Sequence, residues 1–193
     1  MFPGSIVALV TPMHPSGGID YEGLERLINF HRDAGTEGVL IAGTTGESAT
    51  LTRREHIELI ERACELAGGL PVIAGTGSNS TAQTLDLSRT VGNFPVSGFL
   101  VVPPFFNKPT QEGMYRHFSM VAEGVNKPVS LYNVPARTGV DLKPETVMRL
   151  SEHGNITAIK EATGELERVR LLREGCQPDF YLLSGDDGTS CEF

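Results

Sequence analysis

The lysines of this chain differ in their sequence context. Lys160 directly follows an apolar run, Ile156–Ile159, that has the composition of a buried β-strand. The others, Lys108, Lys127 and Lys143, each precede a proline, which places them in turns or at element boundaries. Partial removal from water lowers the pKa of a lysine, and its neutral amine is then a nucleophile toward carbonyl carbon. Lys160 is therefore a candidate Schiff-base nucleophile, and the alternative is a lysine that pairs structurally with a carboxylate.

The neighbouring Glu161 is a poor partner for Lys160, because adjacent residues of a strand point to opposite faces. Tyr132 ends another apolar run and is either a barrel-filling aromatic or a phenol that relays protons. Arg137 lies in a loop bounded by proline and glycine. It is either a surface charge or a planar fork that binds a carboxylate through two hydrogen bonds. The segment GTTGE at 43–47 is either a turn with a capping threonine or an anion site of backbone N–H groups and hydroxyls.

Metal-ligand patterns are missing from the sequence. The five histidines are scattered, and none has the H-x-x-x-H type of spacing found in zinc sites. The pair Asp186-Asp187 suits a turn with a capping aspartate better than a cation site. The three cysteines share no metal-type spacing and predict free thiols. We expect neither a metal nor another cofactor.

Short apolar runs rich in β-branched residues recur along the chain, with the length and composition of parallel strands buried on both faces. They cover residues 5–10, 38–42, 71–74, 98–102, 128–132, 156–159 and 180–183. Amphipathic helical segments alternate with them, which predicts an α/β fold with a parallel sheet. Helix-start signals support this: a Thr52–Glu55 capping box, Thr110 as a cap and Pro144 in a first turn. Met114, Phe118, Val121 and Val125 predict one apolar helix stripe.

Two architectures fit this alternation, a doubly wound open sheet and a closed (β/α)8 TIM barrel. No G-x-G-x-x-G turn or P-loop follows a strand, which favours the barrel. A closed barrel needs eight strands, and the sequence shows seven runs. We therefore predict one incomplete barrel domain over residues 1–193, truncated after about seven strands, with strand eight and the C-terminal helices absent. Barrel active sites lie at the C-terminal ends of the strands, where all the candidate residues fall.

The charge balance restricts the partners. The chain has 16 Lys+Arg against 24 Asp+Glu, a net charge of −8, which opposes binding to a phosphate backbone. No run reaches the roughly 18 apolar residues of a membrane span, and no signal-peptide pattern opens the sequence. The sequence predicts a cytoplasmic protein without nucleic-acid or membrane partners.

Three motifs resemble those of a known family. GTTGE at 43–47, YNVPARTG at 132–139 and IKEATG at 159–164 closely resemble the dihydrodipicolinate synthase (4-hydroxy-tetrahydrodipicolinate synthase) family. These proteins are Schiff-base aldolases of the N-acetylneuraminate lyase superfamily, and the similarity runs along the whole chain. The resemblance implies a lyase that condenses pyruvate with L-aspartate 4-semialdehyde to 4-hydroxy-tetrahydrodipicolinate, in diaminopimelate and lysine biosynthesis, without a cofactor. It also implies a homotetramer built as a dimer of dimers.

The resemblance assigns roles to individual residues by position. Lys160 is expected to form the pyruvate imine, with Thr44 and Tyr132 as members of the proton relay. Thr45 is expected to hold the carboxylate of pyruvate, and Arg137 that of the second substrate. These five residues lie in the three matching motifs.

Two further positions matter for the pocket. Gly185 matches a position that lines it. Phe106 stands where the family usually has the second tyrosine of Pro-Tyr-Tyr-Asn, which enters the neighbouring subunit's site and completes the relay. Because phenylalanine has no hydroxyl, a water or Thr44 alone would have to replace this tyrosine.

An effector site for lysine is also implied by the resemblance. Ser48, Ala49, His56 and Asn79 match the residues of an inhibitor cleft at the tight-dimer interface. Gln83 stands where a glutamate is common in lysine-sensitive members, and an amide cannot neutralise the inhibitor's ammonium group. We expect lysine to inhibit weakly or not at all.

Two other functions remain compatible with the sequence. One is another pyruvate-dependent aldolase or lyase of the superfamily, against which Thr45 and Arg137 favour the synthase. The other is an inactive truncated fragment or pseudo-enzyme that acts only in assembly, which Phe106 and the seven-strand count favour. A barrel that lacks one strand exposes two sheet edges, and exposed edges promote association with other chains.

Overall fold

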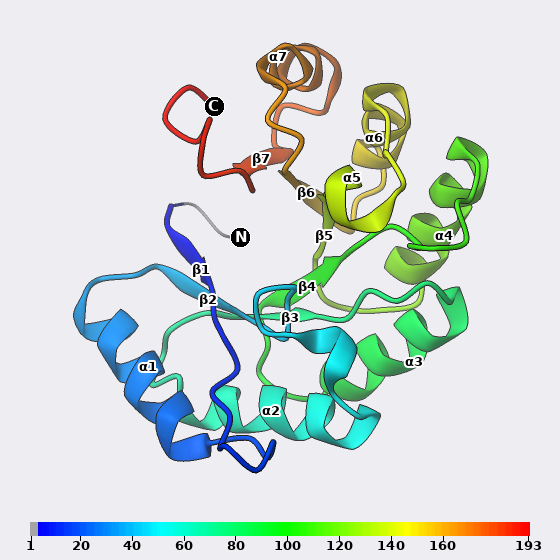
Figure 1. The fold of residues 1–193 in the computed structure, drawn as a ribbon. Helices are drawn as coiled ribbons and strands as arrows, with labels where there is room; N and C mark the ends of the chain where they lie inside the picture. The colour runs from blue at the N-terminus through cyan, green and yellow to red at the C-terminus, as the bar shows by residue number, and fades with distance from the viewer. Residues whose placement is uncertain (1–3) are drawn as a thin grey trace. The chain divides into compact units, whose positions relative to one another are not determined.

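The computed structural model describes residues 4–193, in which strands alternate with helices (Figure 1). The strands are β1 (Ile6–Ala8), β2 (Gly38–Ile41), β3 (Val72–Gly75), β4 (Gly98–Val101), β5 (Val129–Asn133), β6 (Ile156–Glu161) and β7 (Tyr181–Ser184). The α-helices are α1 (Tyr21–Asp33), α2 (Arg53–Leu66), α3 (Thr81–Val91), α4 (Gln111–Glu123), α5 (Pro135–Thr138), α6 (Pro144–Ser151) and α7 (Leu166–Gly175). A 3₁₀ turn, η1 (Ser48–Thr50), precedes α2.

The strand order identifies the fold class. In the seven-stranded sheet the order is β1 to β7, the order of the chain. A doubly wound sheet reverses its order at a switch point, and no such reversal occurs among the described strands. Sequential parallel strands joined by helices are the topology of a (β/α) barrel. The predicted fold class is therefore confirmed, and a strand forms at each of the seven predicted apolar runs.

Contacts divide the described residues into two compact units. The first comprises the residues up to Thr76 together with Leu87–Phe99. Within it, β1 pairs with β2 and β2 with β3, all parallel. Helices α1 and α2 pack against each other, and Leu24 and Ile28 of α1 are completely buried. The prediction of a single domain over residues 1–193 stays a prediction.

The second unit comprises Gly77–Asp86 and Leu100–Phe193. Strand β6 pairs in parallel with β5 on one side and β7 on the other, and α6 packs against both α4 and α7. The register places Tyr132 beside Lys160 and Asn133 beside Glu161. Because registered neighbours share a face of a sheet, each of these two pairs faces one way, and the two pairs face opposite ways.

Local signals in the sequence act as predicted. Thr52 caps α2 and forms the full capping box with Glu55, and the Thr110 side chain accepts a hydrogen bond from the Gly113 N–H at the start of α4. Pro144 occupies the first turn of α6. The prediction was wrong for the last member of the apolar stripe in α4. Val125 lies outside the helix, because Gly124 already forms its C-cap.

Burial differs between the central strands and the ends of the strand order. Every residue of β2, β3, β4 and β5 is buried, as the continuous apolar runs predict. Strands β1 and β7 end the order and are only half-buried. Each fully buried Val, Leu or Ile contributes about 1.5–3 kcal/mol, so the central strands supply most of the stabilisation of the sheet. None of the helices within residues 4–193 combines the length and the apolar character needed to cross a membrane.

Candidate active site

Lys160 is held inside β6, as predicted, and its amine has a distinctive environment. The side chain is half-buried, and Nζ lies 4.8 Å from the centroid of the Tyr132 ring. Within residues 4–193 the amine makes no hydrogen bond or salt bridge. Burial lowers the pKa of Lys160, and the negative charge of Asp187 partly opposes this. Partial desolvation without a paired carboxylate is the condition under which a lysine supplies a neutral, nucleophilic amine.

The contact between Lys160 and Tyr132 follows from the sheet register. Tyr132 is buried, with 7% of its surface exposed, and it is the direct neighbour of Lys160 across β5 and β6. An ammonium over an aromatic face gains from the negative charge density of the ring. Tyr132 therefore supports the amine through its ring, and the proton-relay role of its hydroxyl stays a prediction.

Gly185 is needed beside Lys160 for a steric reason. A Cβ at this position would lie 2.8 Å from Cε of Lys160 and 2.9 Å from the Cβ of Ala162. Such distances are shorter than real carbon contacts, so any larger residue would displace the lysine. The residue predicted to line the pocket thus directly determines the space available to the reactive side chain.

Arg137 lies in the same unit, in the one-turn helix α5, and its side chain is exposed. Its backbone N–H donates to the Val134 carbonyl, and Gly139 ends the turn with a left-handed φ of 67°. In the part of the chain that the structure describes, the guanidinium forms no ion pair. An exposed, unpaired guanidinium on a short ordered turn is available to bind a carboxylate.

Thr44 and Thr45 belong to the first unit. They lie in the turn between β2 and η1, and both side chains are exposed. Among residues 4–193 neither hydroxyl has a hydrogen-bond partner, so the helix-capping alternative for Thr44 and Thr45 receives no support. Thr11 holds this turn by donating to the Gly46 carbonyl at 2.7 Å. Their predicted roles with pyruvate stay predictions.

The residues of the predicted lysine site divide between the units. Ser48 and Ala49 form part of η1, and His56 is a buried residue of α2. Its Nε2 lies 2.7 Å from the Gly75 carbonyl, and burial lowers its pKa. Asn79 belongs to the second unit, where its carbonyl accepts a hydrogen bond from Asn107. His56 has a structural partner within its own unit, and binding of lysine stays a prediction.

A buried polar cluster lies on the opposite face of β5 and β6, and sequence reasoning did not identify it. Asn133 and Glu161 are hydrogen-bonded there, and Asp141 and Arg168 extend the cluster. The alternation rule that separates Glu161 from Lys160 equally separates Asn133 from Tyr132, and this signal was available in the sequence. Within residues 4–193 no group of three His, Cys, Asp or Glu side chains is arranged to hold a metal ion.

These features define a class of protein. A (β/α)-barrel topology carries on its sixth strand a half-buried lysine with a lowered pKa, and among the described residues this lysine forms no salt bridge with a carboxylate. Such an amine has the properties that Schiff-base aldolases require of their nucleophile.

Comparison with known sequences identifies the family. The model of the dihydrodipicolinate synthetase family matches residues 1–193. A 4-hydroxy-tetrahydrodipicolinate synthase from Methylococcus capsulatus is 52% identical over 194 residues, which cover all of this chain and 67% of that protein. The chain belongs to the dihydrodipicolinate synthetase family.

Solved structures agree. A chloride-inhibited dihydrodipicolinate synthase from Acinetobacter baumannii, complexed with pyruvate, matches with a TM-score of 0.97 and 44% identity, over 100% of this chain and 66% of that one. The synthase from Cyanidioschyzon merolae with lysine bound matches with a TM-score of 0.94 and 41% identity, over 97% of this chain and 65% of that one. The chain thus spans about two thirds of the length of these relatives.

Proposed function

We propose that the chain catalyses the Schiff-base condensation of pyruvate with L-aspartate 4-semialdehyde, giving 4-hydroxy-tetrahydrodipicolinate. The observation that carries the proposal is the half-buried Lys160 amine, which has no carboxylate partner among the described residues. The relative from Acinetobacter baumannii was solved with pyruvate, which supports pyruvate as the first substrate.

The chemistry follows from an amine and a keto acid. Nζ of Lys160 attacks the C2 carbonyl carbon of pyruvate, and loss of water gives the imine. Loss of a proton from the methyl group then gives an enamine, whose carbon attacks the aldehyde carbon of the second substrate. The amino group of the condensed semialdehyde then attacks the imine carbon and closes the ring, the bond from this carbon to Nζ of Lys160 breaks, and the product leaves the regenerated lysine amine. Tyr132 and Thr44 are proposed to carry the protons, Thr45 to bind the pyruvate carboxylate and Arg137 to bind that of the semialdehyde.

The assembly is proposed to be a homotetramer, a dimer of dimers. Phe106 supports an interface, because 86% of this apolar side chain is exposed and its φ of 69° is a strained value for a bulky residue. Backbone strain of this kind persists where a functional contact requires it. The missing hydroxyl at this position is the observation that favours the alternative, an inactive member that acts only in assembly. We also propose, from its membership of the dihydrodipicolinate synthetase family, that the protein is cytoplasmic.

Trapping with borohydride tests the proposal. The protein is incubated with pyruvate, reduced, digested and mapped by mass spectrometry, and Lys160 is expected to carry the reduced pyruvate adduct. Adduct on Lys108, Lys127 or Lys143 would contradict the assignment, and absence of any adduct would favour the inactive alternative. Addition of L-aspartate 4-semialdehyde, compared with other aldehydes, then identifies the acceptor.

A further inference from the structure

Asn133 and Glu161 form a hydrogen-bonded pair on the face of the sheet that points away from Lys160. The Asn133 amide donates to the two carboxylate oxygens of Glu161 at 3.1 and 3.3 Å, and the Thr163 N–H donates to Glu161 at 3.0 Å. Asn133 is completely buried, and Glu161 is 2% exposed. The pair directly follows Tyr132 and Lys160 in β5 and β6, so it is anchored to the same backbone as the reactive amine.

Asn133 also binds the far end of the loop that carries Arg137. Its side-chain Nδ2 donates to Oδ1 of Asp141 at 3.0 Å, and its side-chain Oδ1 accepts a hydrogen bond from the Leu142 N–H at 3.0 Å. The loop thus begins at Asn133 and returns to the same side chain at Leu142. Arg137 lies midway between these two points.

Two side chains from other elements hold the same end of the loop. Arg168 of α7 donates to the Leu142 carbonyl at 3.2 Å and to Oδ2 of Asp141 at 3.0 Å, with 9% of its side chain exposed. Gln111 of α4 donates to the Asp141 carbonyl at 2.7 Å. Buried charge-assisted hydrogen bonds are among the strong ones, so this end of the loop is firmly fixed.

The middle of the loop is held from within. The Thr138 hydroxyl lies 3.1 Å from the Val134 carbonyl and 2.9 Å from the Val140 carbonyl, and the Val140 N–H donates back to it. These hydrogen bonds restrict the internal movement of the turn that contains Arg137. Its position therefore depends on the residues that hold the ends of the loop, which are Asn133 together with Arg168 and Gln111.

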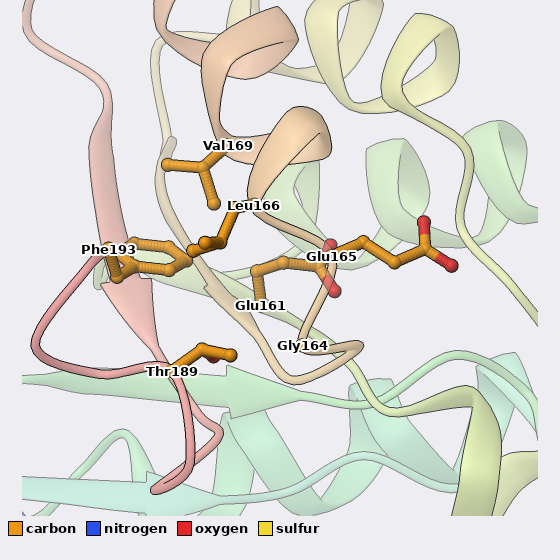
Figure 2. Close-up of a pocket in the computed structure, with 7 residues that line it drawn as sticks. All are labelled: Glu161, Gly164, Glu165, Leu166, Val169, Thr189 and Phe193. Atoms are coloured by element: carbon orange, nitrogen blue, oxygen red, sulfur yellow. The ribbon is translucent and has the colours of Figure 1, made fainter.

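Glu161 is shielded from water on its other side. Figure 2 shows it in a narrow pocket beside Leu166 and Phe193, with Val169 beyond them and Glu165 turned away, and the pocket is too small to admit a water molecule. Burial raises the pKa of Glu161, although the hydrogen bonds from Asn133 and Thr163 oppose the shift. A group that is costly to bury and fully hydrogen-bonded specifies one geometry, because any displacement leaves it unsatisfied.

We propose that Asn133 and Glu161 are positioning residues that fix the Arg137 loop relative to Lys160, and so set the distance between the pyruvate imine and the site for the second carboxylate. The inference rests on the proposed function for the identity of the two substrates. The placement of the loop itself does not depend on that function. Neither residue is expected to touch a substrate.

The substitution Asn133→Asp tests this role with little change in volume. Aspartate keeps an acceptor for the Leu142 N–H but cannot donate to Glu161 or Asp141, and it adds a carboxylate beside both. The KM for L-aspartate 4-semialdehyde is expected to rise about tenfold or more, the effect of one lost charge-assisted contact at Arg137. The rate of pyruvate trapping at Lys160 is expected to change by less than about threefold, because imine formation does not use Arg137.

Asn155→Asp is the matched control. Asn155 precedes β6 at its other end, and its amide, like that of Asn133, donates to two different residues, here to the Ala122 and Val125 carbonyls. This variant should lose stability, but it should not change the KM for L-aspartate 4-semialdehyde more than it changes pyruvate trapping. The double variant Asn133→Asp with Glu161→Gln exchanges donor and acceptor within the pair, and it should recover part of the semialdehyde KM.

The rates of amide hydrogen exchange in residues 134–142 measure how firmly the Arg137 loop is held, and they require no substrate. Faster exchange in Asn133→Asp than in Asn155→Asp supports the inference, and equal exchange overturns it. Equal rises in the KM for both substrates, or no recovery in the double variant, also overturn it. A wild-type protein that traps no pyruvate contradicts the proposed function instead, while the exchange data still decide the role of Asn133.

Discussion

The two faces of β5 and β6 each carry an ionisable side chain that is partly or fully buried, and the two side chains differ in their hydrogen-bond partners. Lys160 and Glu161 are adjacent, Lys160 is half-buried and Glu161 is buried, and burial disfavours the charged form of each. Glu161 receives hydrogen bonds from Asn133 and Thr163, whereas the Lys160 amine makes no hydrogen bond or salt bridge within residues 4–193 and has the Tyr132 ring and the charge of Asp187 near it. The difference teaches that burial by itself does not prepare a residue for chemistry. A buried amine that forms no salt bridge is better suited to act as a nucleophile than a buried carboxylate that is hydrogen-bonded.

The two arginines of the same unit show a parallel contrast. Arg168 is buried and bound to Asp141, Glu165 and the Leu142 carbonyl. Arg137 is exposed on α5, and its guanidinium has no ion pair in residues 4–193. The bound arginine holds the loop, and the unbound one is available to a substrate.

The largest effect is expected for Lys160→Met. This change keeps an apolar chain of similar length and removes the amine, so pyruvate trapping should disappear completely. Because the ammonium is partly desolvated and unpaired, its removal should leave the free energy of unfolding unchanged or raise it. Trapping and denaturant unfolding measure the two results, with Lys127→Met as a control that keeps trapping. A loss of stability would show that Lys160 has a structural partner.

Glu161→Leu should give the opposite result. It removes the Glu161 acceptor from the Asn133 amide and the Thr163 N–H, and one nearby negative charge from Arg168, which keeps Asp141 and Glu165. The expected cost is about 3 kcal/mol of unfolding free energy. Pyruvate trapping at Lys160 should persist in the fraction that stays folded. Glu167→Leu, which removes an exposed glutamate paired with Arg170, should leave stability nearly unchanged. Equal stabilities of the two variants would remove the contrast between the faces.

The pH dependence of stability gives a further contrast between buried groups with opposite pKa shifts. The free energy of unfolding is expected to change by up to about 3 kcal/mol because of His117. Burial lowers the pKa of His117 in α4 from 6.5 to about 4. Among residues 4–193 its Nδ1 has a hydrogen-bond partner, the Thr81 hydroxyl at 2.8 Å, and its Nε2 has none. A lowered folded pKa means that the stabilisation is present above pH 6.5 and is lost as the pH falls toward about 4.

Glu161 has the reverse sign. Its raised pKa means that its contribution to the free energy of unfolding is retained in acid and lost as the pH rises through the folded pKa.

The substitution His117→Asn keeps a polar atom near Thr81 but removes the titrating group. It should therefore reduce the loss of stability between pH 6.5 and 4. Urea unfolding at several pH values measures it. An unchanged slope would assign acid sensitivity to other groups.

The sequence predicted local structure correctly wherever a short residue pattern is compatible with a single backbone conformation. Apolar runs of strand length gave the seven strands, because a parallel sheet is buried on both faces. The capping box of α2 formed because Thr52 and Glu55 satisfy backbone donors within one turn. The stripe in α4 failed at Val125 because periodicity does not register the C-cap at Gly124.

Lys160 could be singled out from the sequence because its position within an apolar run already determines its strand, its face and its partial desolvation. The tertiary structure alone decided which groups surround it. Tyr132 lies 28 residues before Lys160 in the numbering, and only the register of β5 and β6 places its ring under the amine. The Asn133–Glu161 pair is hydrogen-bonded to Asp141 and Leu142, and Arg168 contacts the same two residues, so that separate elements are joined. A hydrogen bond between distant residues leaves no periodic pattern in a sequence. The chain thus specifies by itself which residue is buried, whereas only the folded packing determines whether that residue finds a partner.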